Sequence, residues 1–121
     1  MKWKLEFYQK QNKKIPVKDF LLKTQTKMRA KIVKEIELLE MHGLDLKEPY
    51  IKKIIGKKYK NLYELRIKFS TNITRIIFFV FKEKKIILLN GFIKKTNKTP
   101  LKEIEKSLNY KNDYEKRCNY E

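Results

Sequence analysis

The chain has 121 residues, enough for one domain with a hydrophobic core of its own. Apolar residues make up 41% of it, which excludes a disordered chain, and 31 Lys and Arg against 14 Asp and Glu give a formal net charge of +17. A charge of this size indicates a polyanionic or strongly acidic partner. The excess is concentrated, because residues 51–75 carry +7 and residues 76–99 carry +5.

Composition also argues against several kinds of site. Cys118 is the single cysteine, so no intrachain disulfide can form, and no Cys/His cluster has the spacing of a zinc site. The sequence contains neither an apolar leader nor a run of roughly 18 apolar residues. We therefore expect a cytoplasmic protein with no metal, no other cofactor and no membrane partner.

The first part of the chain predicts a strand followed by two helices. Apolar and polar residues alternate from Trp3 to Tyr8, which is typical of a half-buried strand. Pro16 stands at a favourable first position of a short helix. From Met28 to Leu39, apolar residues recur at helical spacing, and Gly43 is placed to end this second helix. The two helices should form an antiparallel hairpin or one kinked rod.

The second part predicts a connector over residues 44–59, three strands in a meander and a final helix. Residues 62–69 alternate, residues 73–81 are apolar on both faces, and residues 85–93 form another largely buried strand. Thr99 and Pro100 begin the last helix. The expected order is β-α-α-β-β-β-α, an α+β domain over residues 1–110 with a polar tail over residues 111–121. Its antiparallel, curved sheet should carry the helical pair on one face.

Charged residues interrupt these apolar strands, although an unpaired buried charge is costly. The six are Glu64, Arg66, Lys68, Arg75, Lys94 and Lys95. Strand alternation places the first three on the face away from the helices. Arg75 joins them if Lys68 pairs with it across the hairpin, whereas a slip of one residue turns Arg75 toward the helices. With Phe79 and Phe92 as candidate rings, this face predicts either an RNA site or a solvated basic surface.

Three segments also resemble a known family: Leu62-Tyr63-Glu64-Leu65-Arg66, Arg75-Ile76-Ile77-Phe78-Phe79, and Leu89-Asn90-Gly91-Phe92-Ile93-Lys94-Lys95-Thr96 followed by Lys98-Thr99-Pro100. Together they resemble the HigB-like (phage Gp49-like) toxins of the RelE/ParE superfamily, over about residues 3–110. The resemblance implies a RelE-like fold. It also implies a type II toxin that cuts mRNA on the ribosome, without a metal, through attack of the ribose 2′-OH on the adjacent phosphorus.

The resemblance assigns roles to individual residues. Arg75 would stabilise the scissile phosphate and Arg66 would be the second guanidinium. Lys94 and Lys95 would act as acid or phosphate clamp. The general base stays open between Glu64 and a lysine whose pKa is lowered by neighbouring cations. Further RNA-binding candidates are Lys57, Lys58, Lys68 and Phe92.

The resemblance also implies partners. These are a cognate helix-turn-helix (HigA-like) antitoxin, mRNA in the ribosomal A site, and operator DNA for the antitoxin complex. Two alternatives share the sequence features: a ParE-like inhibitor of DNA gyrase, and a non-catalytic nucleic-acid-binding module. A binding module would lose affinity gradually when Arg75 is replaced, whereas a nuclease would lose activity out of proportion to binding. We expect structural or solvent roles for His42 and Cys118.

Overall fold

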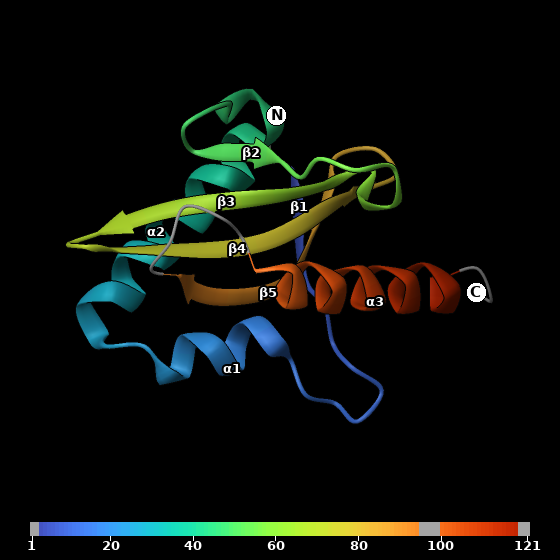
Figure 1. Cartoon of the computed structure of the whole chain (residues 1–121), viewed down its shortest axis with the longest axis horizontal. Coiled ribbons are helices and arrows are strands. Elements are labelled where there is room, and N and C mark those ends of the chain that lie inside the picture. The colour runs from blue at the N-terminus through green and yellow to red at the C-terminus, as the bar shows by residue number, and fades with distance from the viewer. Residues whose placement is uncertain (1–2, 95–99, 119–121) are drawn as a thin grey trace.

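The computed structural model describes residues 3–94 and 100–118 and shows an α+β domain (Figure 1). Its elements in chain order are β1 (Lys4–Phe7), α1 (Pro16–Lys23), α2 (Thr26–His42), β2 (Ile51–Lys53), β3 (Leu62–Phe69), β4 (Asn72–Phe81), β5 (Lys85–Lys94) and α3 (Leu101–Cys118). Short 3-10 turns cover Gly43–Leu46 and Lys57–Tyr59. Compared with the expected order, one strand is added, because β2 forms inside the predicted connector.

The sheet is mixed rather than wholly antiparallel. Its five strands lie in the order β1-β5-β4-β3-β2, and β1 runs parallel to β5 while every other neighbouring pair is antiparallel. The prediction of an antiparallel sheet is wrong at this edge. Lys4 of β1 lies opposite Lys85 of β5, a pairing across most of the chain that local alternation does not encode.

The two helices α1 and α2 cover one face of the sheet, as predicted. We call it the helix face. Leu65 and Ile67 of β3 and Ile76 and Phe78 of β4 pack there in one core cluster with the apolar residues of both helices. Since side chains alternate along a strand, this packing fixes which residues of β3 and β4 point the other way.

Helix α3 lies across part of the opposite face, which we call the α3 face (Figure 1). The sequence predicted an RNA site or a solvated basic surface on this face, but α3 covers part of it with apolar contacts. Phe79 is buried there against Tyr114 of α3, with ring centroids 5.8 Å apart, and so is withdrawn from any base stacking. Tyr114 belongs to the stretch expected as a polar tail, and α3 continues through it to Cys118.

Gly43 ends α2 and brings the chain start against it. Its φ of +56° is a left-handed conformation that favours glycine, and a Cβ there would come within 2.0 Å of the Trp3 ring. The backbone N–H of Trp3 donates to the carbonyl of Glu40, at 2.9 Å. This contact anchors the segment that leads into β1.

Candidate functional site

The register of the β3–β4 hairpin places Arg75 with the other strand charges. Arg66 lies directly opposite Arg75, and Lys68 lies opposite Ile73. The expected pairing of Lys68 with Arg75 is thus shifted by two residues. Because side chains alternate with a period of two, this shift leaves Arg75 on the predicted face.

Four side chains converge on this face, and we call Glu64, Arg66, Arg75 and Lys94 the cationic cluster. The Oε1 atom of Glu64 lies 3.5 Å from Nε of Arg75 and 3.8 Å from Nε of Arg66, so the carboxylate is shared by two guanidinium groups. Lys94 lies on β5, the strand next to the one that carries Arg75, and it pairs with Ile73 of β4. Burial, followed by the charge of Arg75, lowers the pKa of Lys94 below its ordinary value. Three cations therefore surround one carboxylate.

Arg75 is the most unusual member of the cluster. Its side chain is 0% exposed. None of its Nε, Nη1 and Nη2 atoms has a hydrogen-bond acceptor in the part of the chain that the structure describes. Burial lowers the pKa of Arg75 and the nearby Glu64 charge only partly offsets this effect. A buried guanidinium with open donor positions is poor packing, and such perturbed groups concentrate at functional sites.

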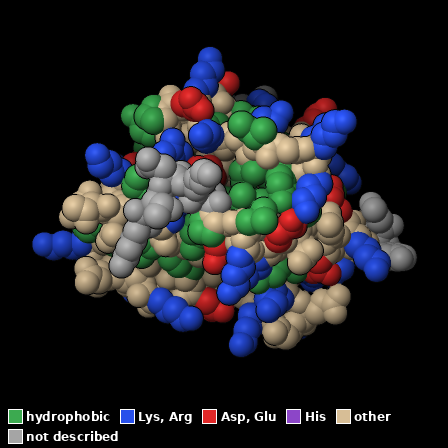
Figure 2. Space-filling view, viewed as in Figure 1, with side chains coloured by type: hydrophobic (Ala, Val, Ile, Leu, Met, Phe, Trp, Pro, Cys, Tyr) green, Lys and Arg blue, Asp and Glu red, His purple; other side chains and the backbone are tan. Residues whose placement is uncertain are grey.

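The cluster reaches solvent through Arg66, whose side chain is 30% exposed, whereas Glu64 and Lys94 are buried. An approaching anion would therefore meet Arg66 first. Figure 2 shows Lys and Arg side chains around the rim of this side of the molecule, with an apolar area near its middle. The long-range attraction for a polyanion is thus spread more widely than the cluster.

The other predicted site residues do not all lie in the cationic cluster. Phe92 lies opposite Arg75 on β5 but is buried in the core of the α3 face. Lys68 is exposed near the end of β3, two residues beyond Arg66. Lys95 falls outside the described residues.

Lys57 and Lys58 stand apart from the cluster. They lie in the turn before β3, and Nζ of Lys58 pairs with Oε1 of Glu105 in α3 at 2.5 Å. From Leu62 to Arg66, β3 extends by roughly 13 Å at the usual strand rise. The structure therefore does not bring these two lysines into the cationic cluster.

Lys52 is a candidate that the sequence did not reveal. It pairs with Glu64 across β2 and β3, so its exposed side chain shares the face of the cluster, and its charge contributes to the lowered pKa of Lys94. The signal for it was the excess positive charge of residues 51–75, but only the unpredicted strand β2 gives Lys52 a direction.

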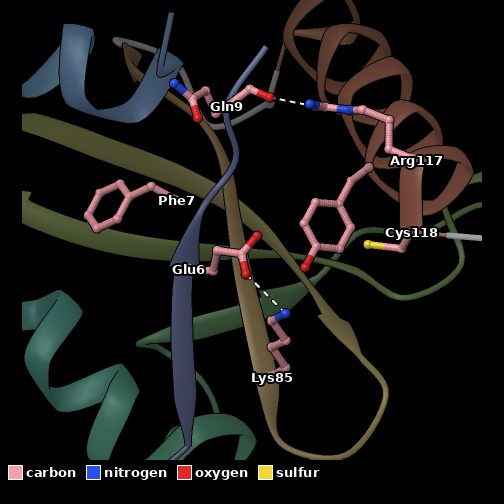
Figure 3. Close-up of a pocket in the computed structure, with 7 residues that line it drawn as sticks. Glu6, Phe7, Gln9, Lys85, Arg117 and Cys118 are labelled. Carbon is pink, nitrogen blue, oxygen red and sulfur yellow. Dashed lines mark hydrogen bonds and ion pairs between the residues drawn. The ribbon is translucent and has the colours of Figure 1, made fainter. Parts of the chain in front are cut away.

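Away from the cationic cluster, a concavity of about 480 Å³ lies between β1 and the C-terminal end of α3 (Figure 3). Its charged side chains have ion-pair or hydrogen-bond partners, although Nε of Arg117 has none among the described residues. Nζ of Lys85 is 3.0 Å from Oε1 of Glu6, and Arg117 donates to the backbone oxygen of Gln9 at 2.5 Å. Cys118 lines this concavity, while His42 ends α2 on the helix face. That His42 and Cys118 have structural or solvent roles stays a prediction.

Within residues 3–94 and 100–118, no three His, Cys, Asp or Glu side chains are grouped so that they could hold a metal ion. Among the helices of the same residues, none is long and apolar enough to span a bilayer.

A model of the phage-derived Gp49-like protein family (DUF891) matches residues 19–112. The chain belongs to this family. A search of curated proteins finds no match. The Gp49-like match confirms the broader part of the resemblance drawn from the sequence. It begins in α1 and ends in α3, so the cationic cluster lies wholly inside the Gp49-like region, whereas β1 and the last residues of α3 lie outside it.

Proposed function

We propose that this Gp49-like protein is the toxin of a type II toxin–antitoxin module and cuts mRNA on the ribosome. The observation that carries the proposal is Arg75, a fully buried guanidinium whose nitrogens have no hydrogen-bond acceptor among the described residues. It lies opposite Arg66 on the neighbouring strand and near Lys94, on a strand face with excess positive charge. Arginine is well suited to the charge that builds on a phosphoryl group in a transition state.

In the proposed reaction the ribose 2′-oxygen attacks the adjacent phosphorus in line. The O2′–P bond forms while the P–O5′ bond breaks, which leaves a 2′,3′-cyclic phosphate and a free 5′-OH. Arg66, the exposed member, contacts the phosphate, and Arg75 stabilises its growing charge from the buried side, where a low dielectric strengthens the interaction. Lys95 is the proposed acid that protonates the leaving 5′-oxygen.

For the general base we favour Lys94 over Glu64. The Oε1 atom of Glu64 is already shared by the ion pairs with Arg66 and Arg75, so this oxygen is occupied before an RNA binds. Lys94 is buried among cations, which favours its neutral amine. A neutral amine can accept the proton from the 2′-OH.

The proposed partners follow from this activity. They are mRNA in the ribosomal A site, a helix-turn-helix antitoxin of the HigA type, and operator DNA bound by the toxin–antitoxin complex. The proposed location is the cytoplasm.

The decisive experiment is inducible expression of the wild type and of Arg75→Met, followed by mapping of 5′ ends on a reporter mRNA. We expect ribosome-dependent cuts with the wild type and at least about a hundredfold fewer with the variant. Arg117→Met is a matched control, because it makes the same change at the far end of α3 and should cut normally. Growth arrest with intact mRNA and damaged DNA would instead indicate a gyrase inhibitor. Wild-type binding to RNA without any cuts would indicate a binding module.

A further inference from the structure

A cavity of about 270 Å³ lies at the edge of the cationic cluster. Helix α2, the segment before β2 and the β3–β4 hairpin all contribute to its wall. The lining residues are Lys31, Glu35, Pro49, Tyr50, Arg66, Ile67, Lys68 and Ile73. Arg66 belongs both to this wall and to the cationic cluster, so a ligand here would lie beside the proposed cleavage site.

Glu35 gives the cavity a buried acceptor. The residue is only 7% exposed, and its Oε1 atom is 2.9 Å from Nζ of Lys31. Its Oε2 atom is buried and has no hydrogen-bond partner in residues 3–94 and 100–118. An unpaired buried acceptor costs free energy, which a ligand donor would recover.

The charges and the ring in the wall favour a nucleotide. Three cations, Lys31, Arg66 and Lys68, accompany one carboxylate, so the wall attracts an anion and repels a cationic side chain. Tyr50 is 48% exposed and offers an aromatic face on which a base can stack. The backbone carbonyl of Tyr50 accepts a hydrogen bond from the backbone N–H of Arg66 at 2.8 Å. This bond holds Tyr50 beside strand β3.

We propose that this cavity binds the base of the nucleotide next to the scissile phosphate and that Glu35 selects that base. Glu35 accepts a hydrogen bond from an exocyclic amino group, as carboxylates do from cytosine. Cytosine, adenine and guanine carry such a group, whereas uracil does not, and the single N3–H donor of uracil lies between two carbonyl oxygens that a carboxylate repels. The assignment rests on the proposed function for its link to cleavage, although binding of the base can be measured alone.

The first test measures binding of CMP, AMP, GMP and UMP to the full chain by calorimetry or NMR. The wild type should bind UMP about tenfold more weakly than CMP. Glu35→Gln should remove this difference, because its amide can also donate to a uracil oxygen. Glu37→Gln is the matched control: it makes the same change at an exposed position of α2 outside the cavity wall and should keep the preference.

Tyr50→Ala gives an independent test at an exposed position, where folding is not at stake. It should weaken all four nucleotides by a similar factor of about ten, since stacking tolerates any base. Equal wild-type affinity for UMP and CMP, or a preference that survives Glu35→Gln, would overturn the assignment. The assignment would also be overturned if Glu35→Gln or Tyr50→Ala weakened binding of the antitoxin and left nucleotide binding unchanged.

Sequencing of cut sites then separates this inference from the proposed function. Wild-type cuts should avoid uracil at one position beside the break, and Glu35→Gln cuts should not. If RNA is cut but both proteins show the same base distribution, the base-selecting role of Glu35 is wrong and the nuclease stands. If no RNA is cut but the CMP preference depends on Glu35, the nucleotide pocket stands and the proposed nuclease fails.

Discussion

The two faces of the sheet carry different kinds of side chain. All charged residues of β3, β4 and β5 lie on the α3 face: Glu64, Arg66, Lys68, Arg75, Lys85 and Lys94. The helix face of these strands receives mainly apolar side chains, together with the uncharged polar residues Asn72 and Thr74. Neighbouring residues of one strand thus have opposite environments, as Arg75 and Ile76 show. Both are 0% exposed, yet Arg75 has guanidinium nitrogens without a hydrogen-bond acceptor among residues 3–94 and 100–118, whereas Ile76 has apolar contacts.

This difference indicates what each face contributes. Apolar burial on the helix face stabilises the fold at about 25 cal/mol per Å². The α3 face is itself divided, because α3 covers an apolar half around Phe79 and leaves the cationic cluster beyond it. Burial of two cations, Arg75 and Lys94, beside one carboxylate does not serve stability well. Substitutions on the two faces should therefore separate stability from activity.

The largest effect on stability is expected at Phe78, on the helix face. It is fully buried and stacks on Tyr63, with ring centroids 5.5 Å apart. Phe78→Ala should lower the free energy of unfolding by about 3–5 kcal/mol, through lost burial and the cavity left behind. Urea unfolding measures this loss. A loss below about 1 kcal/mol would mean that the helix face is not the main source of stability.

Arg75→Met should show the opposite pattern. The variant removes a buried charge and leaves Glu64 still next to Arg66, 3.8 Å away. We expect cleavage to fall by a factor of about 10²–10³. The free energy of unfolding should stay the same or rise by up to about 4 kcal/mol, as when other buried ions are replaced by apolar residues. Urea unfolding of the variant beside the wild type tests this. A marked destabilisation would show that the cluster supports the fold as well.

Lys94→Met should change how the free energy of unfolding depends on pH. Burial lowers the pKa of Lys94 in the folded chain, so the native state releases this proton before the unfolded state does. Wild-type stability should therefore rise with pH between the folded and the unfolded pKa, by about 1.4 kcal/mol for each unit separating them. The variant lacks this rise. We expect its free energy of unfolding to exceed that of the wild type at pH 7, and this difference should shrink toward pH 10.

Urea unfolding at several pH values measures the gap between the two proteins. A gap that widens with pH would contradict the lowered pKa. If Lys94 is also the base, the cleavage rate should increase as pH rises through the lowered pKa of Lys94 in the folded chain. Lys94→Arg should abolish that increase, because an arginine stays protonated.

The sequence predicted the helix face and the direction of the strand charges because both follow from local periodicity. Alternation along residues 62–69 placed Leu65 inward and Arg66 outward, and the helical spacing from Met28 to Leu39 gave α2 its buried side. A two-residue error in the hairpin register did no harm, since it preserves the face.

Features that depend on distant contacts were missed. The parallel pairing of β1 with β5 joins residues that are about 80 positions apart, and no local pattern encodes it. Three-residue β2 is too short to show alternation, so Lys52 had no predicted direction. The cover of α3 over Phe79 depends on Tyr114, in a stretch whose polar composition favoured a frayed tail. The cavity at Glu35 combines three separate segments of the chain.

The smallest effect is expected at Tyr114, which holds α3 onto the sheet. Its ring meets those of Phe79 and Phe81 at 5.8 and 5.2 Å, and burial raises its pKa to about 12 from an ordinary 10.0. Between these values the native state keeps a proton that the unfolded state loses, so wild-type stability should fall as pH rises from 10 to 12. Tyr114→Phe should remove this part of the fall and lower stability near neutral pH by about 1 kcal/mol at most.

Urea unfolding across this pH range, with absorbance titration of the tyrosines, checks the expectation. The variant keeps the ring contacts that cover the apolar half of the α3 face, so cleavage should be unchanged. If cleavage falls together with stability, the covered half and the cationic cluster are coupled. Stability and activity would then be separated between the two faces of the sheet only, and not within the α3 face.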